Sequence, residues 1–261
     1  MRILVTVKYV PDLQSNRSFT DGTVTRTAED GTMNELDENA VEAALQLVEQ
    51  HGGEVYALTV GPADAVAAVR KALQLGVHHA IHVTDEAAAG SDVFATAKVL
   101  AGAISKVHAE EPLDMVITGM AALDGLTSML PTALAVELDW SQLSLASSLE
   151  VADGKATIVR HLPDAHETVV APLPAVVSVT DEANKPRYPN FKLIMAARNA
   201  PVTTWSLADV GVDAKSVGAS ASRTTVVDAS PRPARQNVTI VTDKGEGGTE
   251  LAAFLIERGL V

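Results

Sequence analysis

Short apolar runs alternate along this chain with longer stretches of helical spacing, and this alternation limits the folds open to it. Apolar, β-prone runs recur at residues 2–7, 54–60, 79–83, 113–118 and 175–179. The stretches between the first four place apolar residues on one helical face, at 34–51, 62–75 and 91–109. Strands and helices that alternate roughly every 30 residues are typical of βαβ units. The alternation therefore predicts an α/β fold, a Rossmann-like parallel sheet flanked by helices.

Two hairpins are expected in addition to this sheet. After a helical run at 126–138, strand patterns at 145–151 and 157–161 flank the turn Asp153-Gly154, and a third strand is expected at 167–171. The polar excursion at residues 8–33 carries a second hairpin signal, an Asp21-Gly22 turn between β-forming residues. We expect an added β-hairpin beside the parallel sheet.

Towards the end of the chain the composition becomes typical of a linker. Residues 216–233 are rich in Ser, Ala and Pro, and a short helix is expected at 249–259. A terminal helix that follows such a linker often packs on another subunit. We therefore expect an α/β domain over residues 1–211 and, over 212–261, a C-terminal linker and arm that packs on a partner subunit.

Charge and composition exclude several classes of function. A net charge of −13 argues against nucleic acid, whose binding requires neutralised phosphates. No apolar run approaches the roughly 18–20 residues of a membrane span, so no membrane insertion is expected. With no cysteine there is no disulfide or thiolate nucleophile, and the histidines suggest no metal site. We expect a cytoplasmic protein without a catalytic constellation of its own.

Ligands of open parallel sheets bind beyond the carboxyl ends of the strands. Three junctions fit that position here, at residues 6–12, 60–62 and 119–127. In the third, Gly119 allows close backbone approach, and Asp124-Gly125 with Thr127 and Ser128 stand at a helix start, where N–H groups favour phosphate. No G-x-G-x-x-G or G-x-x-x-x-G-K-[ST] motif is present. The junctions predict a nucleotide-binding domain, although an ordinary glycine-containing turn stays open.

Residues 181–201 form the least ordinary stretch of the chain. Prolines 186 and 189 force an extended path, and a short helical run follows at 192–198. No acid occurs between Ala183 and Asp209, whereas Lys185, Arg187, Lys192 and Arg198 are basic. These facts fit either a solvated basic loop or a protruding recognition loop at about 184–199 that docks a partner.

The chain resembles the β subunit of electron transfer flavoprotein as far as about Gly211. The most specific likeness is Ala175-Val-Val-Ser-Val followed by Asn184-Lys-Pro-Arg-Tyr and Ile194-Met-Ala-Ala. Further matches are Arg2-Ile-Leu-Val-Thr-Val-Lys, Ala40-Val-Glu-Ala-Ala, Val60-Gly-Pro-Ala and Ala122-Leu-Asp-Gly. The resemblance rests on these motifs together, since any one of them alone would be weak.

This resemblance implies an electron carrier rather than a stand-alone enzyme. The family pairs a β subunit with a larger α subunit, which holds most of one FAD, and the β subunit holds AMP. Electrons arrive from dehydrogenases, such as the acyl-CoA dehydrogenases of fatty acid β-oxidation, and pass to a quinone oxidoreductase of the respiratory chain. Two alternatives stay open: a bifurcating-type relative with a second FAD in place of AMP, and a stand-alone nucleotide-binding module.

The resemblance also implies site residues. The cofactor site would use Thr6, Asn34, Glu35, Leu36, Asp37, Val60, Gly119, Met120, Ala121, Ala122, Leu123, Asp124, Gly125, Leu126, Thr127, Ser128, Met129 and Leu130. Leu13 and Leu36 match positions that approach the flavin. Backbone N–H groups are the expected phosphate ligands, because Leu126 and Met129 are apolar.

For partner docking, Phe191 matches the apolar anchor of the family's recognition loop. Around it we expect contacts from Lys192, Leu193, Ile194, Met195 and Arg198. For Arg187, an internal role in holding the turn stays open.

Overall fold

The fold is described from a computed structural model of the chain, which describes every residue except 17, 21, 28 and 237. Internal contacts divide the chain into two compact units, Met1–Ala229 and Ser230–Val261. Residues 212–229, which we expected in the linker, lie within the first unit. The Asp92 carboxylate fixes them there by accepting hydrogen bonds from the backbone N–H groups of Arg223 and Thr224, at 2.7 and 3.0 Å.

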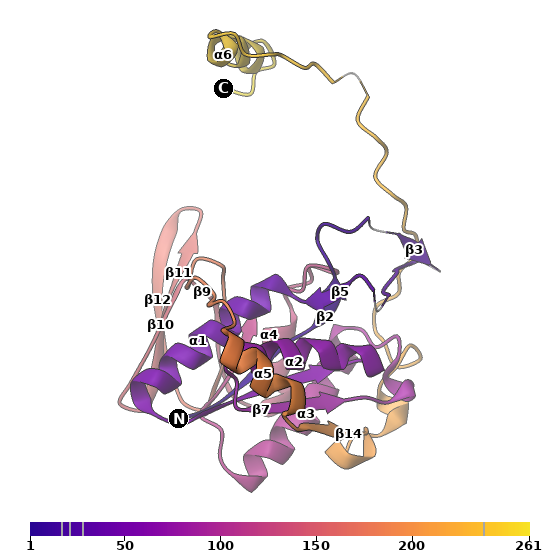
Figure 1. The fold of residues 1–261 in the computed structure, drawn as a ribbon, viewed down its shortest axis with the longest axis vertical. Coiled ribbons are helices and arrows are strands. Elements are labelled where there is room, and N and C mark those ends of the chain that lie inside the picture. Colours follow the sequence, from indigo (N-terminus) through magenta and orange to yellow (C-terminus); the bar gives the residue numbers. More distant parts are fainter. Residues whose placement is uncertain (17, 21, 28, 237) are drawn as a thin grey trace. The chain divides into compact units, whose positions relative to one another are not determined.

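The first unit is built on a seven-stranded sheet in the order β14-β7-β6-β1-β8-β13-β9 (Figure 1). Its neighbouring strands all pair in parallel. The strands are β1 (Arg2–Thr6), β6 (Glu54–Val60), β7 (His79–Val83), β8 (Met115–Gly119), β9 (Ser141–Ala146), β13 (Ala175–Val179) and β14 (Val202–Trp205). The predicted α/β fold with a parallel sheet is confirmed.

Helices cover both faces of the sheet. One face packs against α1 (Glu35–His51) and α2 (Val66–Leu75), and the other against α3 (Val93–Glu110) and α4 (Leu130–Leu138). Alternate residues of β1 serve the two cores, because side chains alternate across a strand: Ile3 faces the first and Leu4 the second. A further helix, α5 (Phe191–Asn199), packs on α2.

Smaller sheets account for the predicted hairpins. Strands β10 (Ser148–Ala152), β11 (Lys155–Leu162) and β12 (Ala165–Pro172) form an antiparallel sheet. In the excursion, β2 (Tyr9–Pro11) pairs with β5 (Gly31–Met33), and β3 (Phe19–Thr20) with β4 (Thr23–Val24). Asp21 of the expected turn between β3 and β4 lies outside the described residues. Short 3-10 turns lie at Ala63–Ala65, Glu86–Ala88, Ala208–Val210 and Ala214–Ser216.

Two expected boundaries were wrong. The strand expected at 145–151 is split, because Leu145 and Ala146 complete β9 of the large sheet and β10 begins at Ser148. The helix expected from residue 126 begins at Leu130 instead. Leu126 and Ser128 have φ of 51° and 52°, in the left-handed region that a right-handed helix excludes.

The second unit contains α6 (Gly247–Glu257), in which no residue is buried. Its Leu251, Phe254 and Ile256 are exposed apolar side chains. No helix in the described part of the chain is long and apolar enough to cross a membrane.

Candidate functional site

The predicted ligand junctions meet at one edge of the sheet. Strands β6, β1 and β8 are neighbours, and all three point the same way. Their last residues, Val60, Thr6 and Gly119, therefore lie along the same carboxyl edge. The loop after Gly119, residues 120–129, leads from this edge to α4. The fold thus brings together three segments that are far apart in the sequence, in the position where open parallel sheets bind ligands.

Asn34 fastens the loop that follows β8. Its side chain is fully buried; Nδ2 donates to the carbonyl oxygen of Ala121 at 2.9 Å, and Oδ1 accepts from the N–H of Leu123 at 3.0 Å. Both polar atoms of the amide are thus used within the protein. Asn34 is therefore a positioning residue of the loop, and a ligand in this position would meet the backbone that Asn34 holds.

Asp37 holds the same region from the first turn of α1. Its carboxylate accepts from the N–H of Lys8 at 2.8 Å and also from the N–H of Gly119. Burial raises its pKa from 3.8 to about 7, against the opposing effect of these hydrogen bonds. A Cβ at residue 119 would lie 2.8 Å from the backbone of Leu36, so the close approach of α1 to β8 requires glycine.

Asp124 connects the loop to the long excursion. Its side chain has 0% exposure and pairs with Nζ of Lys8 at 2.9 Å and with the guanidinium of Arg26. Burial opposes ionisation, yet the two cations hold the pKa of Asp124 below its usual range. Arg26 was not among the predicted site residues, and a single basic residue in a polar stretch gave no signal that it would reach residue 124.

The end of the loop exposes backbone rather than polar side chains. The backbone of Leu126 and of Ser128 adopts the left-handed conformation, whereas that of Met129 is right-handed, with φ of −97°. Adjacent residues of opposite handedness can turn successive N–H groups towards one point, which makes a cradle for an anion. In the described part of the chain the N–H groups of residues 127–129 have no hydrogen-bond partner. The loop can therefore offer N–H donors to a phosphate.

The other predicted cofactor residues lie around this edge with differing exposure. Glu35 is exposed and Leu36 half-buried at the start of α1. In the loop, Ala121 is buried, Met120, Ala122, Leu123 and Leu130 are half-buried, and Gly125 is exposed. Leu13, on the excursion, exposes about half of its surface.

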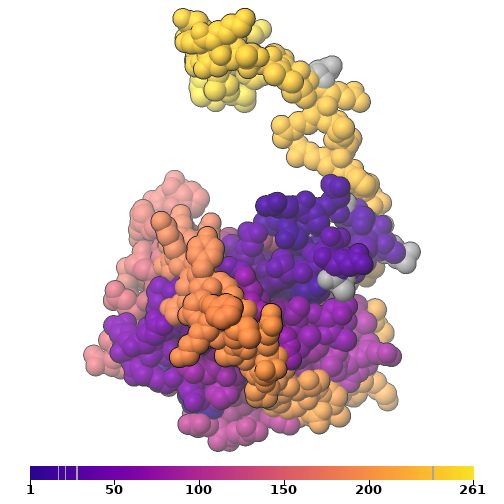
Figure 2. All heavy atoms as spheres, in the orientation of Figure 1, coloured from indigo at the N-terminus to yellow at the C-terminus, as the bar shows by residue number. Residues whose placement is uncertain are grey.

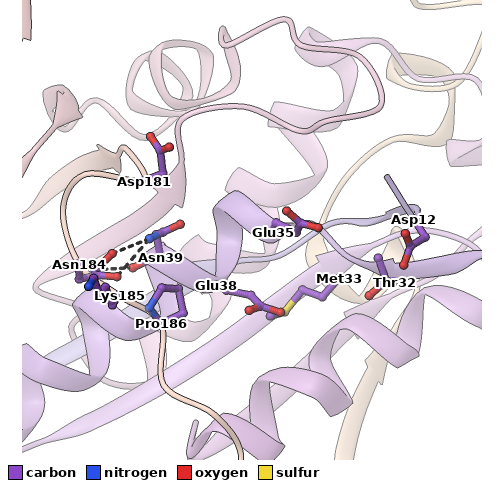
Figure 3. A pocket seen from close by; sticks show the side chains of 10 residues that line it. All are labelled: Asp12, Thr32, Met33, Glu35, Glu38, Asn39, Asp181, Asn184, Lys185 and Pro186. Carbon is purple, nitrogen blue, oxygen red and sulfur yellow. Dashed lines mark hydrogen bonds between the residues drawn. The ribbon is translucent and has the colours of Figure 1, made fainter. Parts of the chain in front are cut away.

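A cavity of about 480 Å³ opens between the start of α1 and residues 181–186 (Figure 3), and its lining includes the predicted cofactor residue Glu35. Four carboxyl groups line it, against one amine: Asp12, Glu35, Glu38 and Asp181 with Lys185. Burial raises the pKa of Glu38. This excess of acid disfavours phosphate, so we do not assign the nucleotide to this cavity.

The predicted recognition loop is anchored to α1 and α2. Arg187 donates from Nε to Glu42 at 2.7 Å and from Nη1 to Glu49 at 2.6 Å, so its internal role is the one observed. Burial works against ionisation of Glu42, yet the hydrogen bonds from Arg187 lower its pKa. Nη1 of Arg70, on α2, donates to the carbonyl of Ala197 at 3.2 Å. The loop is thus attached at its base and along α5.

The outer side of the loop is exposed (Figure 2, orange). Phe191 exposes 79% of its surface, and Met195, one turn further along α5, is exposed on the same face. Lys192 and Arg198 are exposed as well, whereas Leu193 and Ile194 are half-buried. Of the predicted docking residues, Phe191, Lys192, Met195 and Arg198 therefore present the most surface.

Comparison with known proteins identifies the family. The model of the electron transfer flavoprotein domain matches residues 21–210. The chain belongs to the electron transfer flavoprotein family. The resemblance to the β subunit is confirmed, because the chain is 38% identical to electron transfer flavoprotein subunit beta of Mycobacterium tuberculosis, over 99% of both chains.

Other relatives have different names. The CarD subunit of the caffeyl-CoA reductase-Etf complex of Acetobacterium woodii is 33% identical, over 99% of this chain and 97% of its own. Protein FixA of Rhizobium meliloti is 34% identical, over 81% of this chain and 74% of its own. The relatives thus include a protein named as a subunit of a reductase-Etf complex as well as proteins named as electron transfer flavoprotein subunit beta.

Proposed function

We propose that this chain is the β subunit of a heterodimeric electron transfer flavoprotein with AMP bound at the carboxyl edge of its sheet. The observation that carries the nucleotide site is the exposed loop at residues 126–129 beside the start of α4. Among the described residues, the N–H groups of 127–129 have no hydrogen-bond partner there. A phosphate accepts hydrogen bonds from such groups and gains from the positive end of a helix. The cations Lys8 and Arg26, held by Asp124, add positive charge to the same loop.

Other residues would fit the adenosine and the flavin. Thr6 and Val60 stand at the ends of neighbouring strands, where a nucleoside can lie against the sheet edge. FAD, held mostly by the α subunit, would supply the electron-carrying chemistry. Leu13 and Leu36 would offer it aliphatic contact, since an aliphatic side chain can pack on a ring without stacking. The chain's own part would be to position and to dock, as a carrier subunit rather than a catalyst.

The recognition loop would dock the electron donors, dehydrogenases such as the acyl-CoA dehydrogenases. Phe191 would serve as the anchor because a large apolar group that enters a partner's pocket can carry much of the binding energy. The exposed cations Lys192 and Arg198 would steer an acidic partner, which suits brief contacts between redox proteins. A quinone oxidoreductase would accept the electrons. The cytoplasmic location stays a prediction.

The C-terminal arm would pack on the α subunit. In α6 the apolar residues Leu251, Phe254 and Ile256 are exposed, and a helix of 11 residues is marginal in water without tertiary packing. A partner surface that covers these side chains would stabilise the helix.

The nucleotide content of the purified αβ complex tests the proposed site. The complex is denatured, and the released nucleotides are separated and quantified against standards. We expect about one FAD and one AMP per heterodimer. Two FAD per heterodimer would contradict the AMP site and support a second flavin in its place. A β chain that copurifies with no larger subunit would contradict the heterodimer itself.

A further inference from the structure

Tyr188 is an exposed aromatic residue in the recognition loop. It exposes 94% of its surface, more than Phe191. The other tyrosines are half-buried, and the hydroxyl of Tyr56 accepts a hydrogen bond from Arg2. In the described part of the chain no interaction is recorded for the side chain of Tyr188. A solvated aromatic ring of this size is available for contact with a partner.

The backbone on both sides of Tyr188 is fixed. Before it, Arg187 is held by Glu42 and Glu49, and its own N–H also donates to Glu42 at 3.2 Å. After it, Pro189 restricts φ, and the side chain of Asn190 accepts from the N–H of Leu193 at 2.9 Å. The backbone that carries the ring is thus ordered before any partner arrives, which lowers the backbone conformational entropy lost on binding.

A second pair of contacts fixes the loop further back. Nδ2 of Asn184 donates to the carbonyl oxygen of Asn39 at 2.9 Å, and Nδ2 of Asn39 donates to the carbonyl oxygen of Asn184 at 3.0 Å (Figure 3). Both bonds tie the loop to α1, the helix that also holds Arg187. The segment before Tyr188 is therefore attached to α1 at two points.

The neighbouring exposed side chains define the partner. Tyr188 precedes Phe191 by three residues, a distance of at most about 11 Å along the chain. Exposed cations lie on the same helix as Phe191, and in the described part of the chain Lys192 and Arg198 make no ion pair. Arg187 is neutralised within the protein by Glu42 and Glu49. The exposed side of α5 is thus apolar at Phe191 and Met195, with the positive charges of Lys192 and Arg198 on the same helix.

We propose that Tyr188 is a second docking residue, which enters an apolar recess beside that of Phe191 on an oxidoreductase surface rimmed by carboxylates. This inference rests on the proposed function, because the partner is the dehydrogenase that reduces the complex. Two rings held by one rigid loop would fix the angle of approach as well as the point of contact.

The test measures reduction of the FAD-loaded αβ complex by a purified acyl-CoA dehydrogenase of the same organism, itself reduced with excess acyl-CoA. The initial rate of flavin bleaching is followed as the concentration of the complex is varied. For Tyr188→Ala and for Phe191→Ala we expect KM to rise about tenfold or more, with kcat, flavin content and Tm unchanged. Tyr188→Phe should stay within about twofold of the wild type, because the ring carries the contact.

Controls separate this inference from the function on which it rests. Val136→Ala removes an exposed apolar side chain on α4 and should leave KM unchanged. If only Phe191→Ala raises KM, the role of Tyr188 is overturned, whereas the proposed docking function of the recognition loop is supported. If Tyr188→Phe raises KM as much as Tyr188→Ala does, the ring does not carry the contact, and the proposed apolar recess is contradicted. A wild-type complex that the dehydrogenase does not reduce, or two alanine variants without effect, would contradict the proposed docking function.

Discussion

Asp37 lies in the first turn of α1, shielded from water and hydrogen-bonded to two backbone segments. An acid in this turn favours the helix, because the positive end of the helix dipole attracts negative charge. Burial acts in the opposite direction and raises its pKa to about 7. The residue therefore keeps a proton over a range of pH in which an exposed aspartate has lost it.

This shift predicts how stability changes with pH. Between 3.8 and about 7 the folded protein binds a proton that the unfolded chain has released, so the contribution of Asp37 to the free energy of unfolding falls as pH rises. Asp37→Asn cannot ionise. We expect the Tm of the wild type to fall relative to that of Asp37→Asn from pH 5 to about 7, and then to stay level.

Thermal unfolding of both proteins between pH 5 and 8 checks this prediction. Asp153→Asn, in an exposed turn, controls for the loss of one acidic residue. A difference in Tm that is constant over the whole range would show that the buried carboxyl does not govern the effect.

At the scale of elements, α1 connects the two regions to which we assign function. Its first turn and the preceding Asn34 hold the loop after β8, through Ala121, Leu123 and Gly119. Further along, Asn39, Glu42 and Glu49 hold the base of the recognition loop. One helix thus provides a common support for the candidate nucleotide site and the docking loop.

The attachment of the loop to α1 predicts a measurable stability effect. Arg187→Met removes the guanidinium that pairs with the largely buried Glu42 carboxylate, and among the described residues only Gln46 and the backbone N–H of residue 187 then still donate to it. We expect the free energy of unfolding to fall by about 1–3 kcal/mol, as is usual when a buried charged group loses its partner. Glu49→Gln should cost less than about 1 kcal/mol, because that contact is exposed and screened by solvent.

Urea denaturation of the two variants beside the wild type measures both values. Equal losses from Arg187→Met and Glu49→Gln would contradict the view that Glu42 is the main partner of Arg187. The Tyr188 experiment is complementary, since it tests the surface that this attachment presents.

At the scale of the whole molecule, the chain combines a large compact unit with a small separate one. The first unit has its own cores on both faces of the sheet. In the second unit, α6 buries none of its residues. A unit of this size that buries so little apolar surface gains little stability from its own packing, which is why we propose that the α subunit covers it.

Removal of residues 230–261 tests this division. We expect the shortened chain to unfold at nearly the same Tm as the full chain when each is measured alone, because the first unit keeps its own contacts. Copurification with a tagged α subunit should fall about tenfold or more. If the shortened chain binds the α subunit at full strength, the arm does not hold the heterodimer.

The sequence by itself determined the local structure and the family. Apolar runs and helical spacing predicted the parallel sheet, because strand and helix impose different periods on the side chains. The motifs around Asn184 and Ile194 predicted a likeness that the comparisons confirmed. That the three junctions lie at one edge of the sheet was predictable as well, since parallel strands bring their carboxyl ends together, and their role in binding a ligand stays a prediction.

Tertiary structure alone decided how individual residues are used. Asn34 bonds to Ala121, 87 positions away, and Arg187 to Glu42, 145 positions away, and no local pattern encodes such partners. The edge strands β9 and β14 were not predicted, because their pairing with β13 and β7 is set by neighbours in the sheet. Likewise, Leu126 is left-handed against the preference of its residue type. Local propensity sets which element a segment favours, but only contacts between distant segments decide which side chains stay free for function.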